Sequence, residues 1–272
     1  MIRLGLVGYP VQHSLSPLLH EAALQASGLQ GEYSLYPVRP DEAGALRGLV
    51  DSVRSGELAG LNVTIPHKRV VMRFLDELTP SARAIGAVNT IYLKHGQVLG
   101  DNTDCPGFLT ELEHFLPRPQ SSIVLGAGGA ARAVVYALSG TACQVAVAAR
   151  RVEQARKLAG VSPNVQAMEL STQALQRREA DLIVNTTPVG TFPDVDKCAW
   201  PTGLPFPEHA AVYDLVYNPR ETQLVRVARA EGLKAMSGLG MLVEQAALAF
   251  KLWTGHKVER ELLLDAIGQT AH

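Results

Sequence analysis

The segment from Ser122 to Arg132 constrains the fold of this chain more strongly than any other stretch of its sequence. It reads Ser-Ile-Val-Leu-Gly-Ala-Gly-Gly-Ala-Ala-Arg, which is a short apolar strand, a glycine-rich turn and the start of a helix. Gly126 permits a tight turn, Gly128 allows the backbone to approach a pyrophosphate, and Ala131 takes the third position of the GxGxx(G/A) pattern. Because the helix start presents free N–H groups and a partial positive charge, the segment predicts a dinucleotide-binding turn. The alternative is an ordinary glycine-rich loop between a strand and a helix.

Strand-like and helix-like runs alternate on both sides of this turn, which is typical of an α/β fold with largely parallel sheets. Before the turn, the expected strands are residues 2–8, 33–38 and 61–65, and the expected helices are residues 17–26, 42–53 and 68–75. From the turn onward, the expected strands are residues 144–149, 181–185, 212–216 and 234–236, followed by helices at 241–253 and 259–267. The chain is therefore expected to form two α/β units.

A helix expected at residues 104–116 is a natural hinge between these units, with Pro106 in its first turn and Pro117 at its end. The two C-terminal helices exceed what a nucleotide-binding domain needs, so we expect them to cover the first domain. The predicted organisation is a first domain with a mostly parallel sheet and a Rossmann-like second domain, with a cleft between them. Their predicted bounds are residues 1–104, completed by 239–272, and residues 105–238.

The charge balance and the cysteines of the chain narrow the kinds of partner it can have. Lys and Arg number 25 against 26 for Asp and Glu, which removes the electrostatic argument for nucleic acid or an anionic membrane and favours a small-molecule ligand. The three cysteines are scattered without metal-binding spacing, so we expect reduced thiols in a cytoplasmic protein and no metal site. The start of the chain lacks the order of a signal peptide, and a turn splits the uncharged stretch 133–149, so no membrane span is expected.

The residues after the expected strand 144–149 bear on the choice of cofactor. In NAD-preferring folds an Asp or Glu at this point binds the ribose 2′-hydroxyl, whereas here Arg150 and Arg151 follow the strand. Because arginines bind a 2′-phosphate through charge-assisted hydrogen bonds, the sequence favours NADP over NAD. The alternative is that one of these arginines is only a solvated residue at a helix start. The segment 185–190 is expected to line the nicotinamide side, although such a segment also suits a common turn.

Three groups of polar residues in the first domain are candidates for a substrate site. Lys68 is expected at a helix start, where the dipole disfavours a cation, so proton transfer is one reason for its position and a solvated side chain is the alternative. Asp104 stands where the hinge helix begins, and helix capping is its plain structural role. Ser14 and Ser16 follow the first strand and suit a carboxylate ligand, although Ser16 before a proline is also an ordinary helix start.

Taken together, these segments resemble the shikimate dehydrogenase family, which includes quinate/shikimate dehydrogenases, over nearly the whole chain. The motifs that carry the resemblance are Ser14-Leu-Ser16-Pro17, Asn62-Val-Thr-Ile-Pro-His-Lys68, Gly86-Ala-Val-Asn-Thr90, Asn102-Thr-Asp104, Gly126-Ala-Gly-Gly-Ala130, Asn185-Thr-Thr187, Tyr213-Asp-Leu-Val-Tyr217 and Gly240-Met-Leu-Val-Glu-Gln245. The resemblance implies an oxidoreductase that reversibly reduces 3-dehydroshikimate to shikimate with NADP, in the biosynthesis of chorismate and aromatic amino acids. It also implies a cytoplasmic monomer or homodimer.

The resemblance further implies roles for individual residues. Ser14 and Ser16 would hold the substrate carboxylate, and Tyr217 would close the cleft. The substrate hydroxyls and the reacting oxygen would be bound by Thr64, Lys68, Asn89, Asp104 and Gln245, of which Lys68 and Asp104 form the catalytic pair of the family. The cofactor would be bound by Gly126, Ala127, Gly128, Gly129, Ala130, Arg150, Arg151, Thr186, Val216 and Gly238.

The chain departs from the usual pattern of the family in small ways, and these leave the strength of the NADP preference open. Cys105-Pro106 stands where glycine is frequent, Thr191 replaces a frequent methionine, and Ala149-Arg150-Arg151 varies the usual Asn-Arg-Thr. One alternative is a quinate/shikimate dehydrogenase that uses NAD, although it predicts an acidic residue near the ribose. Two further alternatives are a non-catalytic NADP-binding regulator and an enzyme that acts on another small carboxylate.

Overall fold

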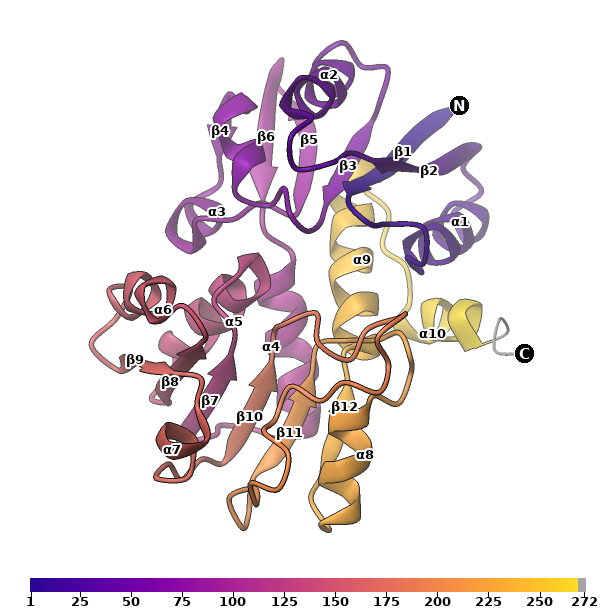
Figure 1. The fold of residues 1–272 in the computed structure, drawn as a ribbon. Coiled ribbons are helices and arrows are strands. Elements are labelled where there is room, and N and C mark those ends of the chain that lie inside the picture. Colours follow the sequence, from indigo (N-terminus) through magenta and orange to yellow (C-terminus); the bar gives the residue numbers. More distant parts are fainter. Residues whose placement is uncertain (269–272) are drawn as a thin grey trace. The chain divides into compact units, whose positions relative to one another are not determined.

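The computed structural model describes residues 1–268 of the 272-residue chain, and the chain divides into two compact units (Figure 1). The first unit comprises Met1–Gly107 and the chain from Val243 onward, and the second unit comprises Phe108–Leu242. Both boundaries fall inside helices, namely α4 (Asp104–Phe115) and α9 (Leu239–Thr254). The boundaries expected from the sequence lie a few residues earlier in the chain.

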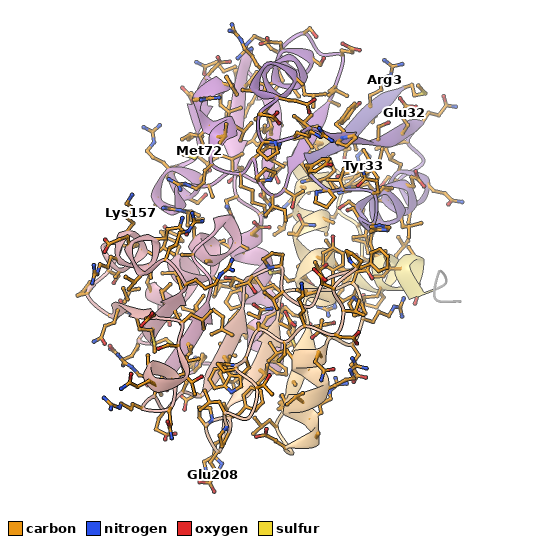
Figure 2. The ribbon with its side chains drawn as sticks, in the orientation of Figure 1. Arg3, Glu32, Tyr33, Met72, Lys157 and Glu208 are labelled. Atoms are coloured by element: carbon orange, nitrogen blue, oxygen red, sulfur yellow. The ribbon has the colours of Figure 1, made fainter. Side chains whose placement is uncertain are left out.

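The first unit contains a mixed six-stranded sheet of order β2-β1-β3-β5-β6-β4. Its strands are β1 (Ile2–Gly8), β2 (Gly31–Pro37), β3 (Gly60–Val63), β4 (Glu77–Leu78), β5 (Thr90–Lys94) and β6 (Gln97–Asp101). β1 is parallel to β2 and β3, and β4 is parallel to β6, whereas β5 is antiparallel to both of its neighbours. The register places Arg3 of β1 opposite Glu32 of β2, where their side chains form an ion pair of 3.3 Å (Figure 2).

Helices cover both faces of this sheet. Leu46, Val50 and Val53 recur at helical spacing on α2 (Ala43–Arg54). Their side chains are buried and pack in one core with residues of β1, β3 and β5. On the other face, α1 (Ser16–Ala26) packs on β2 and on α10 (Arg260–Gly268). The strands therefore end between two layers of helices, and their carboxyl ends are available to position polar side chains.

The second unit contains an all-parallel six-stranded sheet of order β12-β11-β10-β7-β8-β9. Its strands are β7 (Ser121–Leu125), β8 (Gln144–Ala149), β9 (Val165–Glu169), β10 (Leu182–Asn185), β11 (Ala211–Asp214) and β12 (Ala235–Ser237), and its helices after α4 are α5 (Gly129–Ser139), α6 (Val152–Ala159), α7 (Thr172–Leu175) and α8 (Gln223–Ala230). This is the doubly wound order of a Rossmann fold, in which β8 and β9 are added to one side of β7 and β10 to β12 to the other, so that the order reverses between β7 and β10. The predicted α/β fold with a Rossmann-like sheet is confirmed.

Two local predictions differ from the structure. Residues 68–75 were expected to form a helix, but they form a turn and a short 3-10 helix, η1 (Val70–Phe74). The carbonyl oxygen of Lys68 accepts the N–H of Val88, which lies outside this segment. This bond takes the place of the bond that the same carbonyl would make within a regular helix. The β5–β6 hairpin was not expected, although its turn, His95-Gly96, has two positive φ values, as a type I′ turn requires.

No described helix combines the length and the apolar character that crossing a membrane requires.

A buried histidine lies in an aromatic cluster of the first unit. The ring of His20 on α1 stacks on that of Tyr33 on β2, with centroids 4.4 Å apart, and lies 5.1 Å from the ring of Trp253 on α9. Burial lowers the pKa of His20 to about 3, and a hydrogen-bonding contribution from Asn62 opposes this shift only in part. The neutral imidazole is therefore part of the packed core.

We expect the substitution His20→Phe to remove a pH dependence of folding stability. The unfolded chain binds a proton at His20 below the ordinary pKa of 6.5, whereas the folded protein keeps the ring neutral until the pH approaches 3. The free energy of unfolding therefore has no loss from His20 above about pH 6.5. Below this pH it falls as the unfolded chain takes up the proton, by about 2 kcal/mol at about pH 5. Urea unfolding near pH 7.5 and near pH 5 should show this additional loss in the wild type only. Equal losses in both proteins would contradict the assignment.

Candidate active site

A buried ion pair joins the segments that follow the carboxyl ends of β3 and β6 in the first unit. Lys68 Nζ donates to Asp104 Oδ2 at 2.6 Å, and the two side chains are 13% and 6% exposed. Lys68 stands in the turn after β3, and Asp104 is the first residue of α4, so two segments distant in sequence supply the pair. An ammonium has three donors, so this contact leaves Lys68 with hydrogen-bonding capacity for a further oxygen.

Asn89 fixes the other oxygen of the carboxylate. Its Nδ2 donates to Asp104 Oδ1 at 2.9 Å and to Thr103 Oγ1 at 2.9 Å, while its Oδ1 accepts the backbone N–H of Thr103 at 2.7 Å. Asn89 is 2% exposed and precedes β5 directly. Each oxygen of Asp104 therefore has its own donor, and the orientation of the carboxylate is determined by the protein.

Helix capping, the alternative structural role of Asp104, is not what the structure shows. The side chain that accepts a helix-start N–H is that of Asn102, whose Oδ1 bonds to the N–H of Cys105 at 3.1 Å, while its Nδ2 donates to the carbonyl of Ala87 at 2.9 Å. The carboxylate of Asp104 is instead used by Lys68 and Asn89. Burial, with a smaller effect of the neighbouring Asp104, raises the pKa of the Cys105 thiol to about 11, so the thiol stays neutral.

A chain of buried hydrogen bonds extends from Asn89 to the aromatic cluster. Thr90 Oγ1 donates to Asn89 Oδ1 at 3.1 Å, Asn62 Nδ2 donates to the Asn89 carbonyl at 3.2 Å, and Tyr33 donates to Asn62 Oδ1 at 2.8 Å. Asn62, Thr90 and Thr103 were not among the predicted site residues. The sequence did contain a signal for them, because each belongs to one of the motifs that carry the family resemblance. That these residues bond to one another is visible only in the fold.

The remaining predicted substrate residues of the first unit fall into two groups. Ser14 Oγ donates to Ser16 Oγ at 3.1 Å and accepts the backbone N–H of Ser16 at 3.2 Å, so the two hydroxyls lie together at the start of α1. Gln245 on α9 is buried and lies at hydrogen-bonding distance from Asn89, with its Oε1 3.5 Å from Nδ2. Thr64 follows β3 directly, and its backbone N–H bonds to the carbonyl of Val7 on β1.

In the second unit, the glycine-rich turn lies at the switch point of the sheet. Gly126 has a φ of 110°, which L side chains rarely adopt, and a Cβ there would lie 2.7 Å from Thr186 Oγ1. Thr186, which follows β10, donates through its hydroxyl to the carbonyl of Leu125 at 2.6 Å. The N-cap of α5 is Gly128, which has no side chain to cap the helix, and a Cβ on Gly128 would meet open space. The turn and the helix start therefore fit a phosphate.

The two arginines after β8 differ in their surroundings. Arg151 precedes α6, and its Nη2 and Nε donate to the amide oxygen of Gln154 at 3.0 and 3.3 Å, in the amide orientation that satisfies both groups. Arg150 is exposed at the end of the strand. An anion such as a 2′-phosphate could therefore replace solvent at Arg150 and the neutral amide of Gln154 at Arg151.

The other predicted cofactor residues lie along the same turn and at the carboxyl ends of β11 and β12. Ala127, Gly129 and Ala130 belong to the glycine-rich turn and the start of α5. Val216 follows β11, and its carbonyl accepts the N–H of Gly238 at 3.1 Å. A Cβ on Gly238 would lie 2.2 Å from the carbonyl oxygen of Leu215, so this position requires glycine. Tyr217, the remaining predicted substrate residue, follows Val216 in the second unit.

Within residues 1–268, no group of three His, Cys, Asp or Glu side chains is arranged to hold a metal ion.

Comparisons with known proteins agree with this architecture. Residues 6–91 match the shikimate dehydrogenase substrate binding domain, and residues 238–267 match the shikimate 5′-dehydrogenase C-terminal domain. The chain is 44% identical to the shikimate dehydrogenase (NADP(+)) of Methanopyrus kandleri, over 97% of this chain and 93% of that protein.

Solved structures show the same similarity. The shikimate 5-dehydrogenase of Thermus thermophilus in complex with NADP(H) and shikimate has a TM-score of 0.88 and 39% identity, covering 99% of both chains. The quinate dehydrogenase of Corynebacterium glutamicum in complex with NAD has a TM-score of 0.87 and 32% identity, covering 98% of this chain and 99% of the other. Because similarity of this degree extends over nearly its whole length, the chain belongs to the shikimate dehydrogenase family.

Proposed function

We propose that this chain catalyses the NADP-dependent, reversible reduction of 3-dehydroshikimate to shikimate in the shikimate pathway, as a cytoplasmic monomer or homodimer. The observation that carries the proposal is the buried Lys68–Asp104 pair, oriented by Asn89, in a chain of this family. A cation fixed beside a carboxylate suits a reaction that develops negative charge on an oxygen atom. In this proposal the first unit binds the substrate and the second unit binds NADP.

The second unit has the features that NADP requires. The turn at Gly126 and the uncapped start of α5 suit the pyrophosphate, and Arg150 and Arg151 suit the 2′-phosphate. Ala127, Gly128, Gly129, Ala130, Thr186, Val216 and Gly238 complete the proposed cofactor set. When bound, NADPH supplies the hydride that reduces the ketone carbon.

Lys68 acts on the oxygen of that ketone. One of its N–H groups is held by Asp104, so the remaining N–H groups point to a fixed position relative to the carboxylate. At this position the ammonium stabilises the alkoxide that forms as hydride arrives, and a proton on Nζ is available for transfer to it. Asp104 orients Lys68 and accepts a hydrogen bond from the neighbouring substrate hydroxyl.

The remaining proposed residues bind the substrate around this centre. Ser14 and Ser16 present two adjacent hydroxyls that suit the carboxylate. Thr64 and Gln245 bind hydroxyl groups of the ring, and Tyr217 completes the proposed substrate set. Both N–H groups of Asn89 are engaged within the protein, which supports a role in positioning Asp104 in addition to its predicted contact with the substrate.

The first test is the initial rate of shikimate oxidation by the purified protein. We expect turnover with shikimate and NADP, and a kcat/KM at least about tenfold lower when NAD replaces NADP, because NAD offers no 2′-phosphate to the arginines. Quinate with NAD is the control for the rival activity. If quinate oxidation with NAD is at least as efficient as shikimate oxidation with NADP, the proposal is wrong.

Replacing Lys68 with methionine tests the proposed catalytic centre. Methionine keeps much of the apolar stem but removes the donor, so kcat should fall by about 10²- to 10⁴-fold while NADP still binds. The pH profile of the residual activity separates two roles of Lys68. Retention of the same titrating limb with the same pKa in the variant would count against proton transfer by Lys68.

Cofactor selectivity should depend on the two arginines. Arg150→Ala and Arg151→Ala should each raise the KM for NADP by about tenfold and leave the KM for NAD nearly unchanged, because only NADP carries the 2′-phosphate. Arg156→Ala is the matched control, since Arg156 lies on α6, which directly follows the two arginines, and pairs with Glu153. An equal rise for NAD, or the same effect in the control, would refute the role of the arginines.

Asn89→Ala should lower kcat/KM by about 10- to 100-fold, because Asp104 loses its second anchor and the reacting groups shift. Thr79→Ala is a control in the same unit, since it removes the cap of α3 (Pro80–Ile85) and costs about 1 kcal/mol of stability without touching Asp104. Activity in the control should stay close to that of the wild type. Activity losses of the same size in both variants would show that Asn89 acts only through stability.

A further inference from the structure

A second buried carboxylate lies at the carboxyl edge of the Rossmann-like sheet. Asp214 is the last residue of β11, has no exposed surface, and stands in register with Asn185, the last residue of β10. Its Oδ1 accepts Asn185 Nδ2 at 2.8 Å and the backbone N–H of Val216 at 3.0 Å, and its Oδ2 accepts Thr222 Oγ1 at 2.7 Å. These three donors are neutral, and burial raises the pKa of Asp214 to about 6 against the opposing effect of the hydrogen bonds.

These donors bring three segments to one carboxylate. Asn185 Oδ1 accepts the backbone N–H of Thr187 at 2.9 Å and its hydroxyl at 2.7 Å, and Asn185 Nδ2 lies 3.4 Å from the carbonyl of Val189. Thr222 caps α8 by accepting the N–H of Val225 at 3.3 Å. Asp214 therefore connects the loop 185–190, the segment 214–217 and the start of α8.

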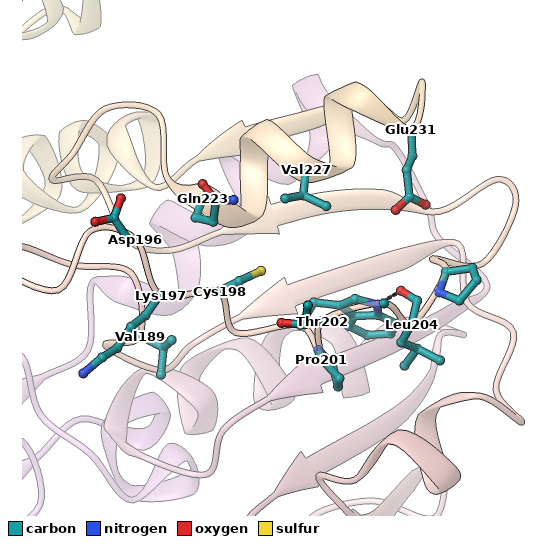
Figure 3. A pocket seen from close by; sticks show the side chains of 13 residues that line it. Val189, Asp196, Lys197, Cys198, Pro201, Thr202, Leu204, Gln223, Val227 and Glu231 are labelled. Carbon is teal, nitrogen blue, oxygen red and sulfur yellow. Dashed lines mark hydrogen bonds between the residues drawn. The ribbon is translucent and has the colours of Figure 1, made fainter.

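The loop 185–190 borders a cavity on one side. The segment 196–205 and α8 line a cavity of about 600 Å³, and Val189 of the loop is part of its wall (Figure 3). Gln223, which directly follows Thr222, lines the same cavity. Val189 has few packing partners on the side that faces the cavity, so the hydrogen bonds of Asn185 to Asp214 and to Thr187 contribute to the placement of the loop.

The strand order separates the two halves of the proposed cofactor site. Arg150 and Arg151, for the 2′-phosphate, follow β8 on one side of β7. Thr186 and Val216 follow β10 and β11 on the other side of β7, and each is within two residues of Asp214 or its partner Asn185. A change at Asp214 should therefore act on one half of the cofactor and leave the other half in place.

We propose that Asp214 is a positioning residue for the nicotinamide half of the cofactor, because its carboxylate fixes the loop 185–190 and the segment 214–217 in the geometry that receives the ring. This inference rests on the proposed function, since it assumes that the second unit binds NADP. It adds a residue that is distinct from the predicted cofactor contacts and does not itself touch the cofactor.

The test compares two ligands on the full-length protein. NADPH carries both halves of the cofactor, whereas 2′,5′-ADP carries the adenosine, its 2′-phosphate and one 5′-phosphate but no nicotinamide. Asp214→Ala should raise the Kd of NADPH by about tenfold and change the Kd of 2′,5′-ADP by less than about twofold. Asp214→Asn should restore most of the NADPH affinity, because asparagine keeps one oxygen for Asn185 and Val216 and can donate to Thr222.

Asp181→Ala is the matched control. Asp181 precedes β10 in the same sheet and accepts the backbone N–H groups of Gln120 and Ser121, so its loss should reduce stability without changing the ratio of the two Kd values. If Asp214→Ala does not fold, Thr222→Val removes one donor at almost constant shape and should weaken NADPH alone, by about threefold.

Three results would overturn the inference: an unchanged Kd for NADPH, an equal weakening of both ligands, or the same selective effect in the Asp181 control. Failure of the wild type to bind either ligand would instead refute the proposed function.

Discussion

The geometry of the first unit depends on the burial of the Lys68–Asp104 pair. Taking two charges out of water costs several kcal/mol per ion, and their attraction offsets this cost only if the geometry is good and the remaining polar atoms are bonded. Asn89 meets that condition by occupying the second carboxylate oxygen, and Thr103 and Thr90 hold Asn89 in turn. The turn after β3, the start of β5 and the start of α4 must therefore assemble together. The contacts that fold this part of the first unit are therefore the same contacts that orient the proposed catalytic pair.

The second unit buries a carboxylate by a different arrangement. Asp214 receives an amide, a hydroxyl and a backbone N–H, and burial still raises the pKa of Asp214 to about 6, because neutral donors compensate desolvation less fully than a cation does. A carboxylate paired with a cation suits a site where charge develops on a substrate. A carboxylate surrounded by neutral donors suits the placement of loops, because each donor fixes a different segment of chain. The two acids thus have different uses that follow from their partners.

The sequence predicts the features that depend on local chemistry. The tight turn at Gly126 and the α/β order of elements could be predicted, because each has a short-range signature. Lys68 and Asp104 were expected to act as a pair through the family resemblance, and the structure shows that their side chains bond to each other. Sequence spacing alone does not choose between Asp104 and Asn102 as the cap of α4, and in the structure it is Asn102, two residues earlier, that accepts the helix N–H. The helix expected at 68–75 failed for a tertiary reason, since the Lys68 carbonyl bonds to Val88. The contacts of Asp214 with Asn185 and Thr222 join three separate segments and are visible only in the fold.

Arg151 already has a partner in the protein, and this partner bears on the role proposed for Arg151 in cofactor choice. In the protein its guanidinium donates to the neutral amide oxygen of Gln154. A 2′-phosphate is a stronger acceptor than an amide, so binding NADP replaces a neutral hydrogen bond by a charge-assisted one that is roughly twice as strong. NAD has a hydroxyl group at this position, which is a neutral acceptor like the amide oxygen of Gln154. Exchanging one neutral acceptor for the other gives Arg151 no comparable gain in hydrogen-bond strength. In the proposed site, selectivity arises from the difference between these two acceptors, because the phosphate must replace the hydrogen bonds that Arg151 makes with Gln154.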